Sequence, residues 1–209
     1  AKVKRCNFCN STDHNKRTCS KLKEVKADIV KANAAFRQAM VKALKDTGQG
    51  IGSLVSGSMS YWEGHGWKES FGVGVVEQID WKQFNLFGYS ERSGSMWLHG
   101  SSGGEPLLVR WAFGKRGYTV LSEPLPDPIS EQKGFFRSRE QTGRSVVSPS
   151  SKVDPPDDWL LSKDKVFISN VDEYFRSRKS LDYSAFKEGM GMRDIINKWI
   201  EYGKQNHSR

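Results

Sequence analysis

The stretch that decides the organisation of this chain is "KRCNFCNSTDHNKRTCSKLK" (residues 4–23), which contains all three cysteines of the 209-residue sequence. Cys6, Cys9, His14 and Cys19 follow one another with gaps of two, four and four residues. A two-residue gap lets one tight turn aim two thiolates at the same ion, and zinc prefers a closed tetrahedron of thiolate and imidazole ligands. We therefore predict that these four residues hold one structural Zn²⁺.

The spacing resembles the CCHC zinc knuckle family, which includes retroviral nucleocapsid proteins and many cellular and viral proteins that bind nucleic acid. The resemblance covers residues 6–19 only, and it implies a metal-held module that binds nucleic acid. Knuckles usually have Gly after the second Cys and before the His, whereas this chain has Asn10 and Asp13. Asn and Asp best tolerate left-handed backbone conformations among the non-glycine residues, so we expect the same turns.

Two apolar side chains usually form the cleft of a knuckle that receives a base. Here Asn7 and Asn15 are polar and only Phe8 is apolar, so we expect weak base specificity. Phe8 either stacks on an unpaired base or packs onto the metal-binding loop itself. The cations expected to contact phosphates, or to extend that basic surface, are Lys4, Arg5, Lys16, Arg17, Lys21 and Lys23.

The positive charge is concentrated in the first quarter of the chain. Residues 1–50 contain 12 Lys and Arg against 4 Asp and Glu, whereas the other 159 residues contain 21 against 20. This one-sided distribution indicates an anionic partner more than simple solubilisation. We expect nucleic acid and not a membrane, because no amphipathic stretch there carries Trp and Phe at the spacing of an interfacial anchor.

A long amphipathic helix is predicted over residues 21–47. Its apolar residues recur at spacings of three, four or seven, Ser20 is placed to cap its start, and Gly48 is placed to end it. These apolar residues are Leu22, Val25, Ile29, Phe36, Met40 and Leu44. The lysines on the remaining surface either extend a phosphate-binding track or solvate the helix, and the sequence favours neither alternative.

Residues 51–122 change to short segments rich in glycine, aromatic and β-branched residues, which predicts a small antiparallel β barrel or sandwich. The expected strands are 53–62, 71–81, 95–100, 106–114 and 118–122, and "GQGIGS" (48–53) is expected to be a hinge or turn. The segment "FGVGVVEQIDW" (71–81) resembles the opening strand of Tudor-like small barrels. Such barrels include those of bacterial helicases and transcription-repair coupling factors that contact RNA polymerase.

The last part of the chain is predicted to be an extended arm followed by helices, which makes the fold class α+β. Residues 123–158 are rich in proline and serine, and their "GFFRSR" either docks on a partner or pins the loop to the barrel. Residues 159–209 are expected to be helical, with helices at 170–178 and 183–205. An apolar face there belongs either to the core or to an assembly surface, and it contains Ile195, Ile196, Trp199 and Tyr202.

No arrangement of residues predicts catalysis, so we expect no enzyme. Four protein ligands leave a metal no coordination position for a water molecule, so the expected site is structural. His65 and His99 flank predicted strands and could converge in one cleft, but a turn histidine beside glycines is usually an ordinary loop residue.

The leading functional hypothesis is a zinc-knuckle protein that binds single-stranded or loosely structured nucleic acid, while its β module contacts a protein partner. Clustered reduced cysteines and the lack of a run of about 18 apolar residues predict a cytoplasmic or other intracellular protein with no membrane partner. The alternatives are a structural component of a virion or ribonucleoprotein complex, and a factor that binds the transcription machinery.

Overall fold

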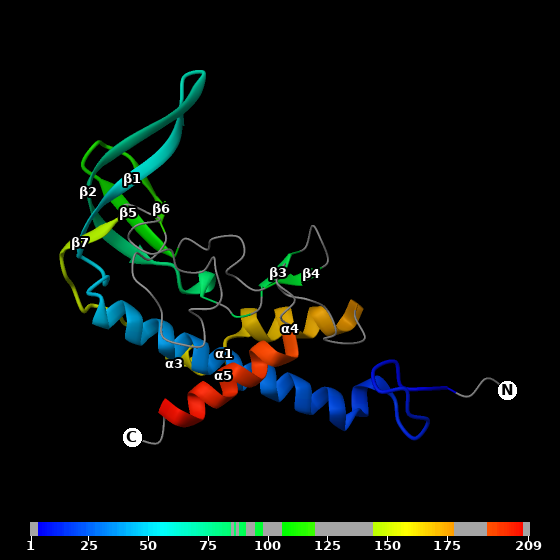
Figure 1. Ribbon diagram of the computed structural model, residues 1–209. Coiled ribbons are helices and arrows are strands. Elements are labelled where there is room, and N and C mark those ends of the chain that lie inside the picture. The colour runs from blue at the N-terminus through cyan, green and yellow to red at the C-terminus, as the bar shows by residue number, and fades with distance from the viewer. Residues whose placement is uncertain are drawn as a thin grey trace. The chain divides into compact units, whose positions relative to one another are not determined.

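The computed structural model describes residues 4–84, 86, 88–90, 95–97, 106–119, 144–177 and 192–206 (Figure 1). The chain forms two compact units. The first consists of Ala1–Phe36, Leu86–Leu98 and Asp157–Arg209, and the second of Arg37–Asn85 and His99–Pro156. The boundary therefore falls inside the long helix α1 (Ser20–Asp46).

The first unit is mainly helical, which confirms the helical segments expected at both ends of the sequence. A 3₁₀ turn η1 (Lys16–Thr18) precedes α1. The C-terminal helices are α3 (Asp157–Leu160), α4 (Lys165–Ser177) and α5 (Met192–Asn206). The two short strands β3 (Gly88–Ser90) and β4 (Ser95–Trp97) pair in this unit as a separate sheet. Residues 178–191, which include the start of the predicted helix 183–205, lie outside the described residues.

α4 begins five residues before the predicted helix 170–178, and the reason is a cap. The side chain of Asp164 accepts a hydrogen bond from the backbone N–H of Phe167 at 3.0 Å, as an N-cap aspartate does. Its carbonyl accepts the bond from Ile168 N–H at 3.2 Å. The sequence thus held a start signal at Asp164 that the prediction did not use.

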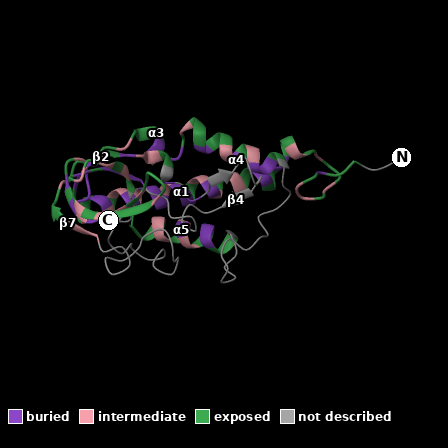
Figure 2. Cartoon of the chain, turned by 90° about the horizontal axis from the view of Figure 1, so that it is seen from above, coloured by how far each residue is buried: buried purple, intermediate pink, exposed green. Residues whose placement is uncertain are grey.

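The core of the first unit lies between α1 and α5. Phe36 and Trp199 are 1% and 0% exposed, and their rings meet edge to face with centroids 5.3 Å apart. Ile195 and Ile196 are also buried. The apolar face of α5 therefore belongs to the core and not to an assembly surface, and buried positions recur along α1 and α5 in Figure 2.

A buried asparagine ties three segments of this unit together. Asn33 of α1 is 0% exposed. Its amide nitrogen donates to Ser162 Oγ at 2.8 Å, and its amide oxygen accepts from Leu86 N–H at 2.7 Å. A buried polar side chain costs little when its groups are paired in this way. Asn33 thus fixes the segments that contain Ser162 and Leu86 against α1.

The second unit contains one five-stranded antiparallel sheet with the order β6-β5-β2-β1-β7. The strands are β1 (Leu54–Glu63), β2 (Gly66–Ile79), β5 (Leu107–Trp111), β6 (Arg116–Thr119) and β7 (Ser145–Ser148). A 3₁₀ turn η2 (Trp81–Gln83) follows β2. The α+β fold class with a small antiparallel β unit is confirmed.

Several strands differ from the sequence prediction. β3 was not expected, and β4, which was expected within the β unit of residues 51–122, pairs with β3 in the first unit instead. β2 begins at Gly66 and not at residue 71, because Gly64, with φ of +65°, closes the hairpin and Glu63 already pairs with Gly66. β7 lies inside the range 123–158 predicted as an arm, and it pairs with the first residues of β1. Residues 120–143, which include "GFFRSR", lie outside the described residues.

The end of α1 is set by Gly48, as predicted. Gly48 has φ of +69°, its N–H bonds the carbonyl of Lys45, and Gln49 N–H bonds the carbonyl of Leu44, which together form a Schellman motif. Gly50 then lies against another segment of the chain, where an added Cβ would stand 2.6 Å from the carbonyl oxygen of Ser150. The "GQG" turn therefore packs closely against the segment that follows β7.

Candidate functional site

The structure brings together the four predicted metal ligands. The ligand atoms of Cys6, Cys9, His14 and Cys19 all lie within 4.8 Å of one another. Cys9 Sγ is 3.0 Å from His14 Nε2. A tetrahedral zinc ion would place sulfurs about 3.8 Å apart and sulfur and nitrogen about 3.5 Å apart. The donor set therefore fits one tetrahedrally coordinated metal ion.

The first two ligands lie on a tight turn of the backbone. Asn10 N–H bonds the carbonyl of Cys6 at 2.9 Å, and Cys6 N–H bonds the carbonyl of Ser11 at 2.7 Å. Asn10 has φ of +65°, so the expectation that it takes the left-handed place of glycine is confirmed. Asp13 does not have a positive φ, and that part of the expectation is wrong.

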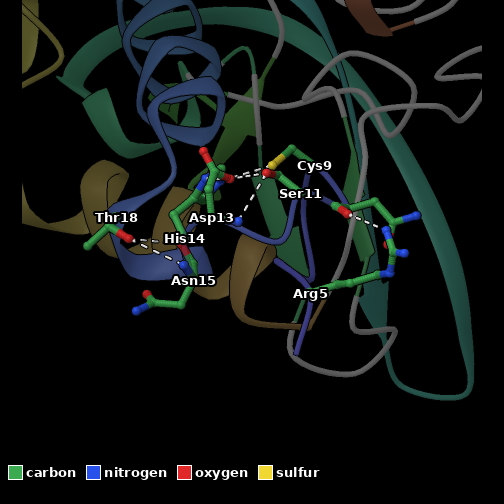
Figure 3. Close-up of polar contacts among 8 residues, drawn as sticks. Arg5, Cys9, Ser11, Asp13, His14, Asn15 and Thr18 are labelled. Carbon is green, nitrogen blue, oxygen red and sulfur yellow. Dashed lines mark hydrogen bonds and ion pairs between the residues drawn. The ribbon is translucent and has the colours of Figure 1, made fainter. Parts of the chain in front are cut away.

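Asp13 instead orients the histidine ligand (Figure 3). Its Oδ1 lies 2.7 Å from His14 Nδ1, which leaves Nε2 facing the thiols. The hydroxyl of Ser11 donates to the same carboxylate, and this bond, followed by those of the Asp13 backbone and His14, lowers the pKa of Asp13. Carboxylates commonly hold metal-ligating histidines in this manner. The sequence signal was a carboxylate next to the histidine, which the prediction read only as a turn residue.

The short distances between the cysteine thiols shift the pKa values of Cys6 and Cys9. Hydrogen bonds from the backbone N–H of Cys9 and of Phe8, together with the other two thiols, lower the pKa of Cys6 to about 6. The pKa of Cys9 is raised: the backbone N–H of Ser11 lowers it, but burial and the neighbouring sulfurs of Cys6 and Cys19 outweigh that effect. A cation bound among the three sulfurs would stabilise their thiolate forms.

The last ligand also starts the long helix. The carbonyl of Cys19 accepts the bond from Lys23 N–H at 3.2 Å, and its backbone is extended, with φ of −69° and ψ of 113°. Cys19 therefore occupies the N-cap position, and Ser20, predicted as the cap, is the first helical residue. Asn15 caps the preceding turn η1 by accepting from Arg17 N–H at 2.8 Å. Consequently the metal site is continuous with α1.

The segment of residues 4–19, which carries the four candidate ligands and is called the knuckle below, also contacts the C-terminal part of α4. Phe8 is half-buried, and its ring meets that of Phe175 edge to face with centroids 5.9 Å apart. The ammonium of Lys16 donates to the carbonyl oxygen of Phe175. In α1, Lys26 forms an ion pair with Asp172 of α4 at 2.6 Å. Phe8 thus packs against Phe175, a residue that the sequence did not connect with it.

The cations of the knuckle surround a shallow pocket. It has a volume of about 380 Å³ and is lined by Arg5, Asn7, Asn15, Lys16 and Arg17. The remaining predicted contact residues, Lys4, Lys21 and Lys23, are exposed and do not line it. The lining of the pocket therefore consists of two asparagines and three cationic side chains.

The lysines of α1 divide into two groups. Ion pairs with carboxylates engage Lys26, Lys31 and Lys42. Within the described part of the chain, Lys21 and Lys23 form no ion pair. The first turn of α1 therefore adds unpaired positive charge next to the metal site, whereas much of the later charge is compensated.

A second surface feature, which the sequence prediction missed, lies on the β1–β2 hairpin. The side chains on one face of it are exposed: Trp62 by 59%, Trp67 by 73% and Phe71 by 69%. Trp62 and Trp67 pair directly across the strands with ring centroids 5.8 Å apart. Val73 and Leu54 extend this hairpin face toward the sheet. The alternation of "SYWEGHGWKESF" (60–71) was the signal for it.

The two histidines considered for catalysis do not form a site that can be described. His65 is exposed in the turn of the β1–β2 hairpin. His99 lies outside the described residues.

Comparison of the chain with protein-family models, curated proteins and solved structures gave no match. Among the described helices, none has both the length and the apolar character needed to cross a lipid bilayer.

Proposed function

We propose that this chain is a non-enzymatic zinc-knuckle protein that binds single-stranded or loosely structured nucleic acid through residues 4–23. The observation that carries the proposal is the ligand cluster of Cys6, Cys9, His14 and Cys19 with a pocket beside it that is lined by three cations and no carboxylate. Lys4, Arg5, Lys16, Arg17, Lys21 and Lys23 supply the positive charge, against Asp13 as the only carboxylate in this stretch.

Zinc is the metal that suits this donor set best. Three thiolates and one imidazole are soft to borderline ligands, and their tetrahedral closure is typical of structural zinc sites. When bound, the ion supplies folding energy to a loop that has no apolar core of its own. The chain then does the binding: η1 and the turn at Asn10 hold the cations in place around the ion.

Nucleic acid is the anionic partner that fits the cations best. Phosphate contacts from Lys and Arg supply most of the affinity of non-specific nucleic-acid binding and make it strongly salt-dependent. A small knuckle presents no helix or ribbon that could fill a duplex groove, so the preferred form is single-stranded.

We propose further that the second unit contacts a protein partner through the hairpin face. Trp62, Trp67 and Phe71 are exposed together, and large aromatic side chains are enriched in the centre of protein interfaces. The lysines of the hairpin region, Lys68 and Lys115, are paired with Glu63, so this region offers little charge to a phosphate backbone.

A matched pair of variants tests the nucleic-acid proposal. Arg17→Gln and Lys45→Gln remove the same charge from exposed positions, one beside the metal and one in the last turn of α1. We expect Arg17→Gln to weaken binding of a single-stranded oligonucleotide in fluorescence anisotropy and Lys45→Gln to leave it almost unchanged. Equal losses would mean that net charge, and not the knuckle, attracts the nucleic acid.

A second candidate function is an assembly role, either within a virion or ribonucleoprotein complex or as a factor on the transcription machinery. The exposed hairpin face favours it, because an apolar surface of this kind is rare on proteins that act alone. Size-exclusion chromatography of native extracts discriminates the two functions. An assembly component elutes with the complex at high salt, whereas a nucleic-acid-binding protein is released as salt rises.

A further inference from the structure

We propose that the pocket beside the metal site binds a phosphodiester group of the nucleic-acid backbone and that the knuckle holds no base. This inference rests on the proposed function and specifies its mode of contact. It concerns the pocket lined by Arg5, Asn7, Asn15, Lys16 and Arg17.

The composition of the pocket suits an anion. Three of the five lining residues are cations and two are amides, and none is acidic or aromatic. The nearest carboxylate in the sequence, Asp13, is engaged by His14 and Ser11. A site that is lined by cations and amides and by no carboxylate attracts a phosphate.

The hydrogen-bonding groups of the pocket are mainly donors. The amide oxygen of Asn15 accepts from Arg17 N–H at 2.8 Å, so its amide nitrogen is the group left for a ligand. Arg5 uses one guanidinium nitrogen for a 3.3 Å bond to the carbonyl of Asn10, and the other donors remain. Phosphate oxygens only accept, so they match this donor set, whereas most nucleobase edges other than the N7/O6 edge of guanine also present donors.

The pocket also lacks the platform that a base requires. Phe8 does not line it, and its ring packs edge to face on Phe175. The bond from Lys16 to the carbonyl of Phe175 holds the same loop on α4. Base stacking on an aromatic ring contributes much of the affinity of single-stranded binding where it occurs. In this knuckle the one aromatic ring serves as a packing residue.

The test compares two strands of equal length and charge, an oligodeoxythymidine and an abasic deoxyribose-phosphate strand, binding to the full-length metal-loaded protein at low salt. We expect dissociation constants within about threefold of each other. Binding of the oligodeoxythymidine alone would overturn the inference and leave the proposed function intact. Failure of both strands to bind would overturn the proposed function as well. Binding of a phosphopeptide but of neither strand would overturn the inference and assign the pocket to a phosphorylated protein.

Three variants locate the contact, each with its metal content measured. Asn15→Asp keeps the acceptor for Arg17 N–H and places a carboxylate in the pocket, so we expect a loss of about tenfold or more for both strands. Thr12→Asp is the control, because it makes the same charge change at an exposed knuckle residue away from the pocket. Phe8→Leu keeps an apolar contact with Phe175, and we expect unchanged binding. A loss confined to the base-bearing strand in Phe8→Leu, or equal losses in the two aspartate variants, would overturn the inference.

Discussion

The knuckle and the β1–β2 hairpin are opposite kinds of surface. The knuckle exposes cations, while its only aromatic ring, Phe8, packs on Phe175. The hairpin exposes Trp62 and Trp67, while the lysines near it pair with carboxylates. The difference places the exposed positive charge and the exposed aromatic side chains on separate segments of one chain.

The way each segment is held together explains this separation. Metal ligands at residues 6–19 replace an apolar core, so the knuckle surface can be almost entirely polar. The hairpin is held by backbone pairing of Leu54–Glu63 with residues 66–75, while Trp62, Trp67 and Phe71 on one face stay exposed. Each surface is therefore free to serve a different partner.

The largest expected effect is the loss of the metal. Cys9→Ala should release the ion and unfold residues 6–19, because structural zinc supplies on the order of 10–16 kcal/mol to such a module. The sheet of the second unit should keep its fold. Metal analysis and the amide NMR spectrum measure the two outcomes, and Thr12→Ala serves as the control at an exposed position.

Shifted amide signals throughout the hairpin of Cys9→Ala would show that the two segments are not independent. Absence of stoichiometric metal from parent protein purified under reducing conditions would refute the metal site itself.

The second effect separates exposed from buried tryptophan. Trp199 is 0% exposed, so Trp199→Ala should lower the free energy of unfolding by about 3–5 kcal/mol. Trp67 is 73% exposed, so Trp67→Ala should lower the free energy of unfolding by less than about 1 kcal/mol. Urea denaturation of both variants measures the contrast. A similar cost for both would make the hairpin face structural and remove the argument that it serves a partner.

The third effect concerns the salt dependence of nucleic-acid binding. If Lys4, Arg5, Lys16 and Arg17 contact phosphates, the logarithm of the affinity for a single strand should fall with the logarithm of salt at a slope of about −3. Arg17→Gln should flatten this slope by about 0.7, whereas Trp67→Ala should leave it unchanged. A flatter slope in Trp67→Ala would place nucleic acid on the hairpin and end the division between the two surfaces.

The smallest effect is a pH dependence at the hairpin. Hydrogen bonds and charge from Lys68, and then from Lys115, lower the pKa of Glu63 to about 2 from its ordinary value of 4.5. The stabilisation is present above the ordinary pKa and is lost as pH falls from about 4.5 to about 2. Solvent screening keeps it small, because Glu63 is 44% exposed.

Glu63→Gln should therefore lower Tm slightly at pH 7 and not at pH 2. Scanning calorimetry across this range checks the difference. A constant difference at all pH values would mean that the ion pairs contribute nothing.

Parts of the protein that depend on neighbouring residues could be predicted from the amino-acid sequence. The ligand set of Cys6, Cys9, His14 and Cys19 follows from short gaps that one or two turns can close. The extent of α1 follows from apolar periodicity and from Gly48 at its end. Local hydrogen bonds and side-chain spacing decide both features, so no distant partner was needed to predict them.

Features that join residues far apart in the chain could not be predicted from the sequence and became visible in the three-dimensional structure. Phe8 and Lys16 meet Phe175, and Lys16 and Phe175 are 159 positions apart. β7 pairs with β1 from a range that reads as an arm, because four residues with little periodicity form a strand only when an edge is available to them. The exposure of Trp67 and the burial of Trp199 also depend on residues far away in the chain. Composition makes both residues apolar, and the path of the rest of the chain determines which one is covered.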